Sequence, residues 1–328
     1  MTSERSIPEP VTAVLEGAGA WLPGELARVE AGLTEVIDGL GPLATDGAAT
    51  LRAGGKRMRP MLVLLCAGPE GGEGAVRAAV AVELIHMASL VHDDVLDRAP
   101  LRRGIPTTYA TAGRERATTL GDALFSSTFA MLARAGDLRA TELLSLTAVD
   151  LARGELLQRE GAYDLGLTAG DYETRCRLKT GSLFSAACVL GGEAGGAGPE
   201  QSEGLAAFGR GIGLAFQLLD DVLDLAGPPE RTGKARGTDL LDGTVTLPVI
   251  RAIELDPSLA EVDLNQLDEE SVAELSDRIA ATGALDQVRA EALAMIDRAK
   301  SSPALESMDP EQRRLLELVA DGVVQRYS

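Results

Sequence analysis

The chain has 328 residues, of which 45% are hydrophobic, and a formal net charge of −19 at pH 7. The hydrophobic content is enough for a sizeable core, whereas the acidic balance excludes a nucleic-acid partner, because binding such a backbone requires a basic face. We also expect no transmembrane segment, since no run of residues reaches the uninterrupted apolar length of a membrane span.

The start of the chain and its cysteines predict a cytoplasmic protein. Residues 1–8 lack the basic and apolar regions of a signal peptide. The 3 cysteines, Cys66, Cys176 and Cys188, are odd in number and have no metal-ligand spacing. Reduced thiols fit this pattern, as in most proteins of the cytoplasm.

Apolar residues recur at helical spacing through most of the chain, and no segment shows the convincing alternation of a strand. The pattern predicts helices over residues 61–66, 78–96, 118–134, 141–158, 183–190, 205–226, 247–254, 271–281, 284–299 and 311–326. Connections rich in Gly and Pro separate helices at residues 67–74, 191–199 and 226–237. No linker is long or polar enough to divide the core. We therefore predict an all-α, single-domain helical bundle over residues 11–328, preceded by a flexible tail of residues 1–10.

The last predicted helix has a recognisable start. Asp309 is an acidic N-cap, Pro310 takes the first helical position, and Gln312 takes the third. This arrangement is typical of a helix N-terminus.

The first motif along the chain is basic and spans residues 54–60, Gly-Gly-Lys-Arg-Met-Arg-Pro. Its two glycines permit backbone geometry that brings Lys56 and Arg59 toward one point. Pro60 suits the first turn of the following helix. On this motif alone, an exposed basic turn is the alternative.

The same acidic pentapeptide, Asp-Asp-Val-Leu-Asp, occurs at residues 93–97 and again at residues 220–224. Each copy lies in an apolar helical stretch, and its first and last aspartates are i and i+4, so both project from one face about one turn apart. Mg²⁺ prefers oxygen ligands and usually bridges one or two carboxylates to substrate phosphates. Two copies suggest a diphosphate held by metal from two sides, with a pair of solvated acidic turns as the alternative.

Positive charge is concentrated in compact spots of this acidic protein, at residues 56–59 and 102–103. Concentrated Arg and Lys beside carboxylate clusters fit a small, multiply charged anion that binds together with its metals. The 2 histidines, His86 and His92, are six residues apart, which does not place both on one helical face for zinc.

Taken in chain order, these motifs resemble the trans-isoprenyl diphosphate synthases, the all-α family that builds polyprenyl diphosphates. The matching segments are residues 54–60, 83–92 leading into 93–97, 101–104, 121–122, 179–181, 216–217 leading into 220–224, and 233–240. They occur in the family's order and spacing, and weaker similarity in helical layout extends to the C-terminus. The resemblance implies an isoprenoid synthase-type bundle with a central active-site cavity, and a homodimer.

The resemblance also implies a reaction: condensation of isopentenyl diphosphate with an allylic diphosphate of farnesyl or geranylgeranyl type, with release of diphosphate. Magnesium would be held by Asp93, Asp97 and Asp220, with Asp94, Asp221 and Asp224 in support and Asp239 just outside the ligands. The allylic diphosphate would be contacted by Arg102, Lys179 and Lys234, and isopentenyl diphosphate by Lys56, Arg59, His86 and Arg103. Gln217 and Thr180 would position the reacting groups; these two and Asp239 remain open as ordinary polar groups of helices or loops.

One position departs from the family pattern. Many members carry a lysine in the loop after the second acidic motif, where this chain has Thr244. The change removes one potential diphosphate contact. Longer-chain members often lack this lysine as well, so the resemblance still implies an active enzyme.

Product length in this family depends on the tunnel below the first acidic motif. Position 88, five residues before Asp93, lies about 7–8 Å down the helix axis. Short-chain members tend to block that level with an aromatic residue, whereas Ala88 and Ser89 leave it open. Phe125 or Phe129 on the next helix would then be a deeper floor, unless both are core residues. We predict a product longer than geranylgeranyl diphosphate.

Three alternatives remain. A short-chain synthase making farnesyl or geranylgeranyl diphosphate would share every motif. A non-catalytic subunit of a heteromeric synthase usually lacks one aspartate motif, and this chain retains both. A class I terpene cyclase typically has a mixed Asn/Ser/Glu site in place of the second motif and uses aromatic faces to steady cations, whereas only 3% of this chain is aromatic.

Overall fold

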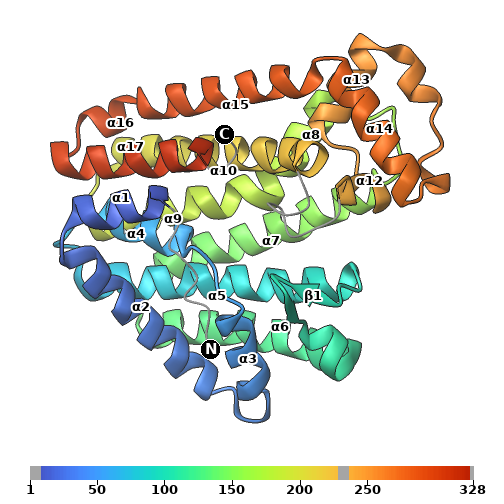
Figure 1. The fold of residues 1–328 in the computed structure, drawn as a ribbon. Helices are drawn as coiled ribbons and strands as arrows, with labels where there is room; N and C mark the ends of the chain where they lie inside the picture. The colour runs from blue at the N-terminus through green and yellow to red at the C-terminus, as the bar shows by residue number, and fades with distance from the viewer. Residues whose placement is uncertain (1–8, 228–235, 326–328) are drawn as a thin grey trace. The chain divides into compact units, whose positions relative to one another are not determined.

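The computed structural model describes residues 9–227 and 236–325, and confirms the all-α prediction. The helices are α1 Glu9–Ala18, α2 Trp21–Asp38, α3 Ala44–Arg52, α4 Met58–Ala67, α5 Gly72–Leu96, α6 Thr108–Arg134, α7 Leu138–Glu160, α8 Ala169–Cys176, α9 Ser182–Ala194, α10 Pro199–Ala226, α12 Thr238–Leu241, α13 Leu247–Leu255, α14 Glu269–Ala281, α15 Ala284–Lys300, α16 Pro303–Glu306 and α17 Pro310–Gln325 (Figure 1). Shorter elements are the strands β1 Leu101–Arg102 and β2 Ile105–Pro106, the π-helical turn η2 Arg177–Gly181, and the 3₁₀ turns Gly41–Leu43, Pro257–Glu261 and Leu264–Gln266.

Every helix predicted from periodicity is present, and most are longer than predicted. The prediction missed α1, α2, α3 and α8, and the short helices α12 and α16. In α2 the buried residues Leu22, Val29, Leu33 and Ile37 follow a helical period, but Pro23, Gly24 and Gly32 interrupt the apolar pattern around them. The predicted start of the last helix is confirmed, because the Asp309 carboxylate accepts from the backbone N–H groups of residues 311 and 312.

The described chain forms two compact units that interleave along the sequence. The first unit takes the described residues up to Ala148, then Leu183–Gly209 and Ser302–Gly322. The second takes Val149–Ser182, the described part of Arg210–Ser301, and the described residues from Val323 onward. The single domain over residues 11–328 stays a prediction. Of the predicted tail, residues 1–8 lie outside the described residues, and α1 already begins at Glu9.

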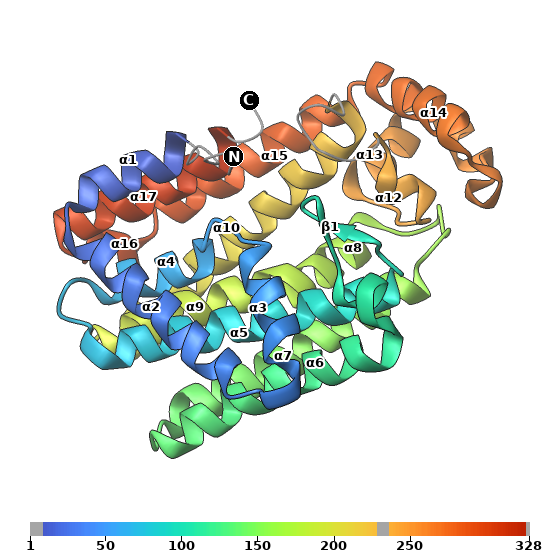
Figure 2. The ribbon, with the colours of Figure 1, turned by 60° about the horizontal axis from the view of Figure 1, so that its bottom comes forward.

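Helix α5 is the core of the first unit, packing against α2, α4 and α6 (Figures 1 and 2). It is apolar on nearly all sides, as a helix enclosed by other helices should be. The two ends of the chain contribute to the same unit, since α1 lies beside α17 and Gly17 contacts Leu315. Helix α9 contacts α4 backbone to backbone, because a Cβ on Gly191 would lie only 2.2 Å from the Val63 carbonyl oxygen.

Contrary to the sequence expectation, α5 is long and apolar enough to cross a membrane by length and composition. However, 72% of its most apolar window is buried inside the protein. This burial identifies α5 as a core helix. Its hydropathy is high because most of its residues contact neighbouring helices rather than water.

In the second unit α13 packs on α15, α14 and α8, while α12 contacts α14. The turn η2 follows α8 directly, and the C-terminal half of α10 belongs to the same unit. Polar residues of η2 and α10 face each other here, as described below.

Candidate active site

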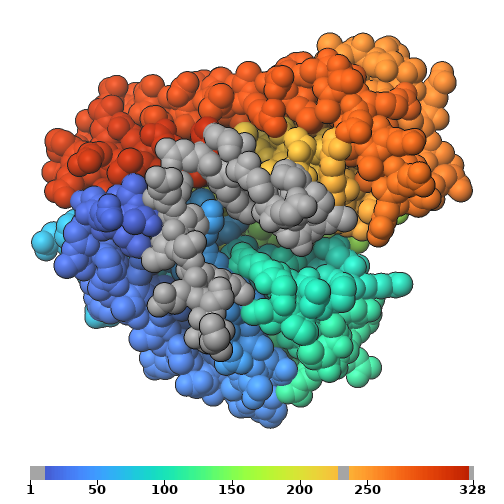
Figure 3. Space-filling model, viewed as in Figure 1, coloured from blue at the N-terminus to red at the C-terminus, as the bar shows by residue number. Residues whose placement is uncertain are grey.

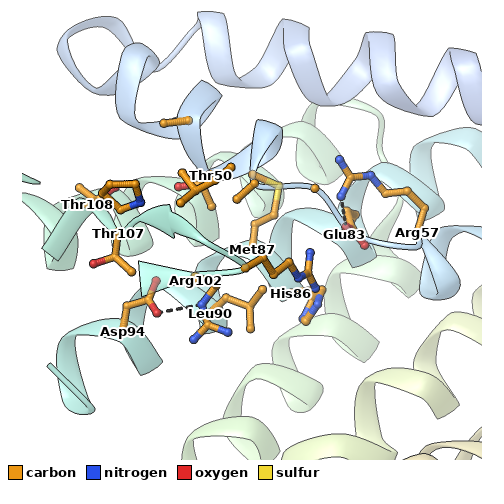
Figure 4. Close-up of a pocket in the computed structure, with 16 residues that line it drawn as sticks. Thr50, Arg57, Glu83, His86, Met87, Leu90, Asp94, Arg102, Thr107 and Thr108 are labelled. Carbon is orange, nitrogen blue, oxygen red and sulfur yellow. Dashed lines mark hydrogen bonds and ion pairs between the residues drawn. The ribbon is translucent and has the colours of Figure 1, made fainter. Parts of the chain in front are cut away.

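A pocket with an empty volume of about 540 Å³ opens in the first unit between α3, α5 and the β1–β2 hairpin (Figure 4). Helix α5 contributes one face to it, with lining residues Glu83, His86, Met87, Leu90 and Asp94 at helical spacing. Two ion pairs mark opposite ends of this face, one at Glu83 and the other at Asp94, with the apolar side chains between them (Figure 4).

The first ion pair joins Arg57 of the basic motif to Glu83. The Arg57 guanidinium donates to the Glu83 carboxylate at 2.9 Å and also to Glu30, and Glu83 is only 4% exposed. Arg57 has a left-handed backbone, with φ 47°, at the N-cap of α4. A non-glycine residue rarely adopts this backbone conformation, so it needs support from elsewhere. The ion pairs of the Arg57 guanidinium give that support and hold the basic motif in one defined shape.

Arg59 is the second cation beside Glu83. Its guanidinium lies 4.4 Å from the centroid of the Phe184 ring, and its Nε has no hydrogen-bond partner among the described residues. Burial, together with the charge of Arg103, lowers the pKa of Arg59 to about 10, against the attraction of Glu83. Arg59 is therefore still a cation at neutral pH, held beside a carboxylate inside the core.

The hairpin brings two more arginines to the pocket. Arg102 in β1 donates to the Asp94 carboxylate at 2.8 Å. Arg103 and Gly104 form the two-residue turn with φ 54° and 76°, as in a hairpin with a left-handed turn. The Arg103 guanidinium lies against Gly55, since its Nη1 would be 2.9 Å from a Cβ atom on that glycine. Arg103 is exposed. Residues of this part of the chain, coloured teal, form part of the surface shown in Figure 3.

His86 lines the pocket between these arginines. Burial, followed by the charges of neighbouring arginines such as Arg59 and Arg103, holds the pKa of His86 well below its ordinary value of 6.5. His86 is therefore a neutral hydrogen-bonding group in a cationic surrounding.

Lys56 lies elsewhere in the same unit. It lines a second pocket of about 350 Å³ together with Val14, Met61 and Leu318. Of the four residues predicted to bind isopentenyl diphosphate, His86 and Arg103 line the larger of these two pockets, and Lys56 lines the other. Arg59 lines neither of the two.

The first acidic motif lies at the C-terminal end of α5. Asp93 is half-buried, Asp94 is buried in its pair with Arg102, and Asp97 is exposed as the helix C-cap. Burial raises the pKa of the Asp94 carboxyl, although Arg102 opposes that shift. Asp93 is turned about 100° round the helix from Asp94, so it projects from a face adjacent to the pocket face.

The second unit holds Lys179, in the π-helical turn η2. Lys179 donates to Glu155 and, at 3.3 Å, to Gln158. Burial alone would raise the pKa of Glu155, but the charges of Lys179 and Arg159 hold it below the ordinary range. Short π-helical segments are frequent at functional sites, and here the turn places consecutive polar residues, Lys179 and Thr180.

Thr180 begins a chain of hydrogen bonds that ends at the second acidic motif. Its hydroxyl donates to the Gln217 side-chain oxygen at 2.9 Å, and the Gln217 amide donates to Asp221 at 2.8 Å. The other oxygen of Asp221 accepts from the Tyr172 hydroxyl at 2.6 Å. Burial raises the pKa of Asp221 to about 7, and both hydrogen bonds oppose that shift. Thr180 and Gln217 are therefore linked to the second acidic motif by hydrogen bonds.

The rest of the motif is half-buried and faces the following loop. The Asp224 carboxylate accepts from the backbone N–H of Asp239 at 3.2 Å, and its carbonyl accepts from the N–H of Gly237 at 2.9 Å. These bonds fold residues 237–239 back onto the end of α10. Lys234 lies outside the described residues.

The donor set fits magnesium, although no three His, Cys, Asp or Glu side chains form a metal cluster within residues 9–227 and 236–325. Mg²⁺ seldom occupies an all-protein cage and takes one or two carboxylates together with waters and phosphates. Both acidic motifs end long helices, α5 and α10, and neither helix has a basic residue in its last turn. A helix C-terminus carries partial negative charge, so carboxylates there are unfavourable until a cation binds.

The four residues predicted to control product length all belong to α5 and α6. Ala88 is fully buried, Ser89 is half-buried with its hydroxyl donating to the His86 carbonyl, and Phe125 and Phe129 are half-buried. Neither of the two pockets described above includes them. Their role in product length stays a prediction.

Sequence reasoning missed Arg57, Glu83, Glu155 and Tyr172. Each is recognised only through a partner distant in the sequence, such as the 49 residues between Tyr172 and Asp221. Glu83 carried the one usable signal, because a carboxylate in the middle of an apolar helical run requires a buried partner.

Comparisons with known proteins agree on one family. The family model described as Polyprenyl synthetase matches residues 43–281. The chain is 43% identical to heptaprenyl diphosphate synthase component 2 of Geobacillus stearothermophilus over 73% of its length and 76% of the relative's. It is 35% identical to geranylgeranyl diphosphate synthase of Methanosarcina mazei, covering 84% and 86% of the two chains. The crystal structure of polyprenyl synthase from Caulobacter crescentus CB15, complexed with calcium and isoprenyl diphosphate, superposes with a TM-score of 0.88 at 32% identity, covering 99% of this chain and 100% of that one.

We predict that Glu83→Gln lowers the free energy of unfolding by about 3 kcal/mol, because it leaves buried arginines without their counter-charge. Urea denaturation followed by circular dichroism measures the change. The control is Glu25→Gln, which removes a more exposed partner of Arg28 and should change stability little. Equal effects of the two substitutions would contradict a buried counter-ion role.

His86 should make folding stability depend on pH below neutrality. Its pKa is depressed in the folded state, so below about pH 6.5 the unfolded chain takes up a proton that the folded chain does not. The stability from this group is present above the unfolded pKa and is lost as the pH falls through it. We expect His86→Gln to flatten the loss of urea stability between pH 7.5 and 5.5. An unchanged pH slope would show that His86 titrates normally.

Proposed function

Because the chain belongs to the polyprenyl synthetase family of prenyltransferases, we propose that it catalyses Mg²⁺-dependent condensation of isopentenyl diphosphate with an allylic diphosphate. The single observation that carries this proposal is the repeated acidic pentapeptide at residues 93–97 and 220–224, each copy closing a long helix. Two carboxylate pairs at negative helix ends provide the charge that would attract divalent metal ions, and these ions would in turn bind the diphosphate.

In this proposal the allylic substrate binds at the acidic motifs. Asp93, Asp97 and Asp220 would hold Mg²⁺, with Asp224 in support and Asp239 just outside the ligands. When bound, Mg²⁺ would neutralise the diphosphate and favour its departure. Asp94 and Asp221 are engaged by protein partners, Arg102 and Tyr172, and thereby keep each motif in place. The calcium and isoprenyl diphosphate in the Caulobacter relative support a divalent metal together with this class of ligand.

Isopentenyl diphosphate belongs to the cationic pocket of the first unit. Arg103 and Arg57 flank Gly55, and neutral His86 offers a hydrogen bond without competing for charge. Arg59 holds a buried, unsatisfied Nε–H group, whose cost an incoming anion would offset. Lys56 would complete the contacts to isopentenyl diphosphate that the family pattern assigns. The same pattern assigns Arg102, Lys179 and Lys234 to the allylic diphosphate, and Thr180 to positioning of the reacting groups.

The reaction balances without a protein base. The carbon–oxygen bond of the allylic diphosphate breaks, and the double bond of isopentenyl diphosphate forms the new carbon–carbon bond. The lost proton leaves with the departing diphosphate. The chain's own residues bind and orient both substrates, and Gln217, held by Thr180, keeps the second acidic motif aligned.

We propose a product longer than geranylgeranyl diphosphate, because Ala88 and Ser89 present no aromatic block one turn below Asp93. A short-chain product is the second candidate, since the relatives named above include both a heptaprenyl and a geranylgeranyl synthase.

Two rival functions have less support. A terpene cyclase does not need a second complete aspartate motif, and this chain has one at residues 220–224. The Geobacillus relative is named component 2, which suggests an enzyme made of different subunits. The presence of both acidic motifs favours a catalytic rather than a non-catalytic chain.

We further propose a homodimer in the cytoplasm. Leu138, Leu146 and Leu156 on α7 are 78%, 60% and 56% exposed and fall within about 80° of one another round the helix. An exposed leucine stripe of this kind suits a second copy of the chain. The thiols of Cys66, Cys176 and Cys188 are free and buried, which suits a reducing compartment.

The decisive assay incubates the purified chain alone with farnesyl diphosphate, isopentenyl diphosphate and Mg²⁺. We expect diphosphate release that a chelator abolishes and a linear product longer than geranylgeranyl diphosphate. In the same assay Ala88→Phe should shift the main product to geranylgeranyl diphosphate or shorter, because the ring fills the open level below Asp93.

The matched control is Ala31→Phe, at an exposed position of α2, which should leave product length unchanged. A geranylgeranyl end product from the unmodified chain would refute the open tunnel. A cyclic hydrocarbon would overturn the synthase itself, and activity only after addition of another protein would indicate a heteromeric enzyme.

A further inference from the structure

The segment Gly121-Asp122 on α6 has no role in the reaction described above, yet the structure gives it a specific partner. The His92 ring, from the residue immediately before Asp93, lies directly against it. A Cβ on Gly121 would be 2.3 Å from His92 Nε2 and 2.4 Å from its Cδ2. The ring therefore occupies the space that any side chain at position 121 would take.

Gly121 is buried in the interior of α6, where glycine is unfavourable compared with alanine. A helical glycine of this kind needs a packing reason, and the imidazole of His92 supplies it. The ring is also covered by Phe125, with centroids 5.7 Å apart. Residues 118, 121, 122 and 125 share one face of α6, so together they form a seat for the ring.

One hydrogen bond of His92 fixes its tautomer. Nε2 lies 3.3 Å from the Thr118 carbonyl oxygen, which can only accept, so this nitrogen carries the proton and donates it. The Asp122 carboxylate lies 3.2 Å from the same nitrogen and places a negative charge beside that N–H group. The ring is thus held by shape on one side, and by a hydrogen bond and a neighbouring charge at one nitrogen.

We propose that Gly121 and Asp122 are positioning residues for the first acidic motif, acting through His92. Anchoring residue 92 to α6 fixes the rotation of the last turn of α5, where an unanchored helix end would fray. Asp93 is the next residue, and Asp97 caps the same turn by donating its N–H to the Asp93 carbonyl at 2.8 Å. The seat therefore sets the direction in which both carboxylates point.

This inference rests on the proposed function for its metal, but part of its test does not require catalysis. Binding of Mg²⁺ to the purified full chain is measured by calorimetry with inorganic diphosphate present. The state of His92 is read from imidazole ¹⁵N shifts, which are simple because the chain has only 2 histidines. His86→Gln assigns the two signals.

Two substitutions of similar size separate the polar contact from the charge at position 122. Asp122 is 68% exposed in its side chain, so neither should prevent folding. Asp122→Asn keeps a polar oxygen beside Nε2 and should retain the Nε2–H signal, with Mg²⁺ affinity within about 2-fold of wild type. Asp122→Leu removes every polar atom of this side chain and should weaken Mg²⁺ binding about 5-fold, the scale of one polar contact.

Gly121→Ala should displace the ring, lose the Nε2–H signature and weaken Mg²⁺ binding by more than about 10-fold. In the enzyme assay kcat should fall, while KM for isopentenyl diphosphate changes little, because the pocket face of α5 is separate. The matched control is Gly24→Ala on α2, where a Cβ meets no atom within 4 Å. That variant should bind Mg²⁺ and turn over like wild type.

The outcomes are distinguishable. Two results would contradict the positioning role of Gly121 and Asp122. One is equal Mg²⁺ affinity in Asp122→Asn and Asp122→Leu, and the other is a folded Gly121→Ala chain that binds Mg²⁺ like wild type. A chain without prenyl transfer whose Mg²⁺ and diphosphate binding still follows the expected order would overturn the proposed function and support the seat.

Discussion

The structure depends on one constraint: each charged group inside this helical core needs a partner. Helix α5 is apolar nearly throughout, and its two buried carboxylates are paired, Glu83 with Arg57 and Asp94 with Arg102. In the second unit Asp221 is held by hydrogen bonds rather than by a cation. An unpaired charge in such surroundings would cost several kcal/mol, so these contacts hold the buried carboxylates in defined positions.

The constraint makes the aspartates of each motif unequal. The middle aspartate of each pentapeptide faces the protein, and the outer two, on a separate helical face, are half-buried or exposed. Since both motifs close long helices, the partial negative charge of the helix ends adds to that of the carboxylates. Divalent cations bound together with a diphosphate would neutralise both the carboxylates and the partial charge of the helix ends. In the proposed function the same reasoning supports binding of isopentenyl diphosphate in the arginine pocket, where Glu83 is the counter-charge of Arg57.

Much of this was predictable from sequence, and the exceptions have a common cause. Helices and motifs depend on local spacing, so periodicity and the pentapeptides identified them. Partners such as Tyr172 and Glu83 depend on contacts between elements distant in the chain, which no local pattern encodes. The role of Gly121 was hidden for the same reason, since the ring it accommodates belongs to another helix. Lys56 shows the reverse case, in which a motif residue lines a different pocket from its neighbours.

We propose that the two acidic motifs serve one diphosphate rather than two. Calorimetry tests this directly, with an allylic thiodiphosphate, whose carbon–sulfur bond resists cleavage, binding to the chain in Mg²⁺. We expect one analogue per chain, with Asp93→Asn and Asp220→Asn each weakening the same binding event and the double variant falling short of the sum of both effects. Two analogues per chain, each lost with only one of the substitutions, would contradict it.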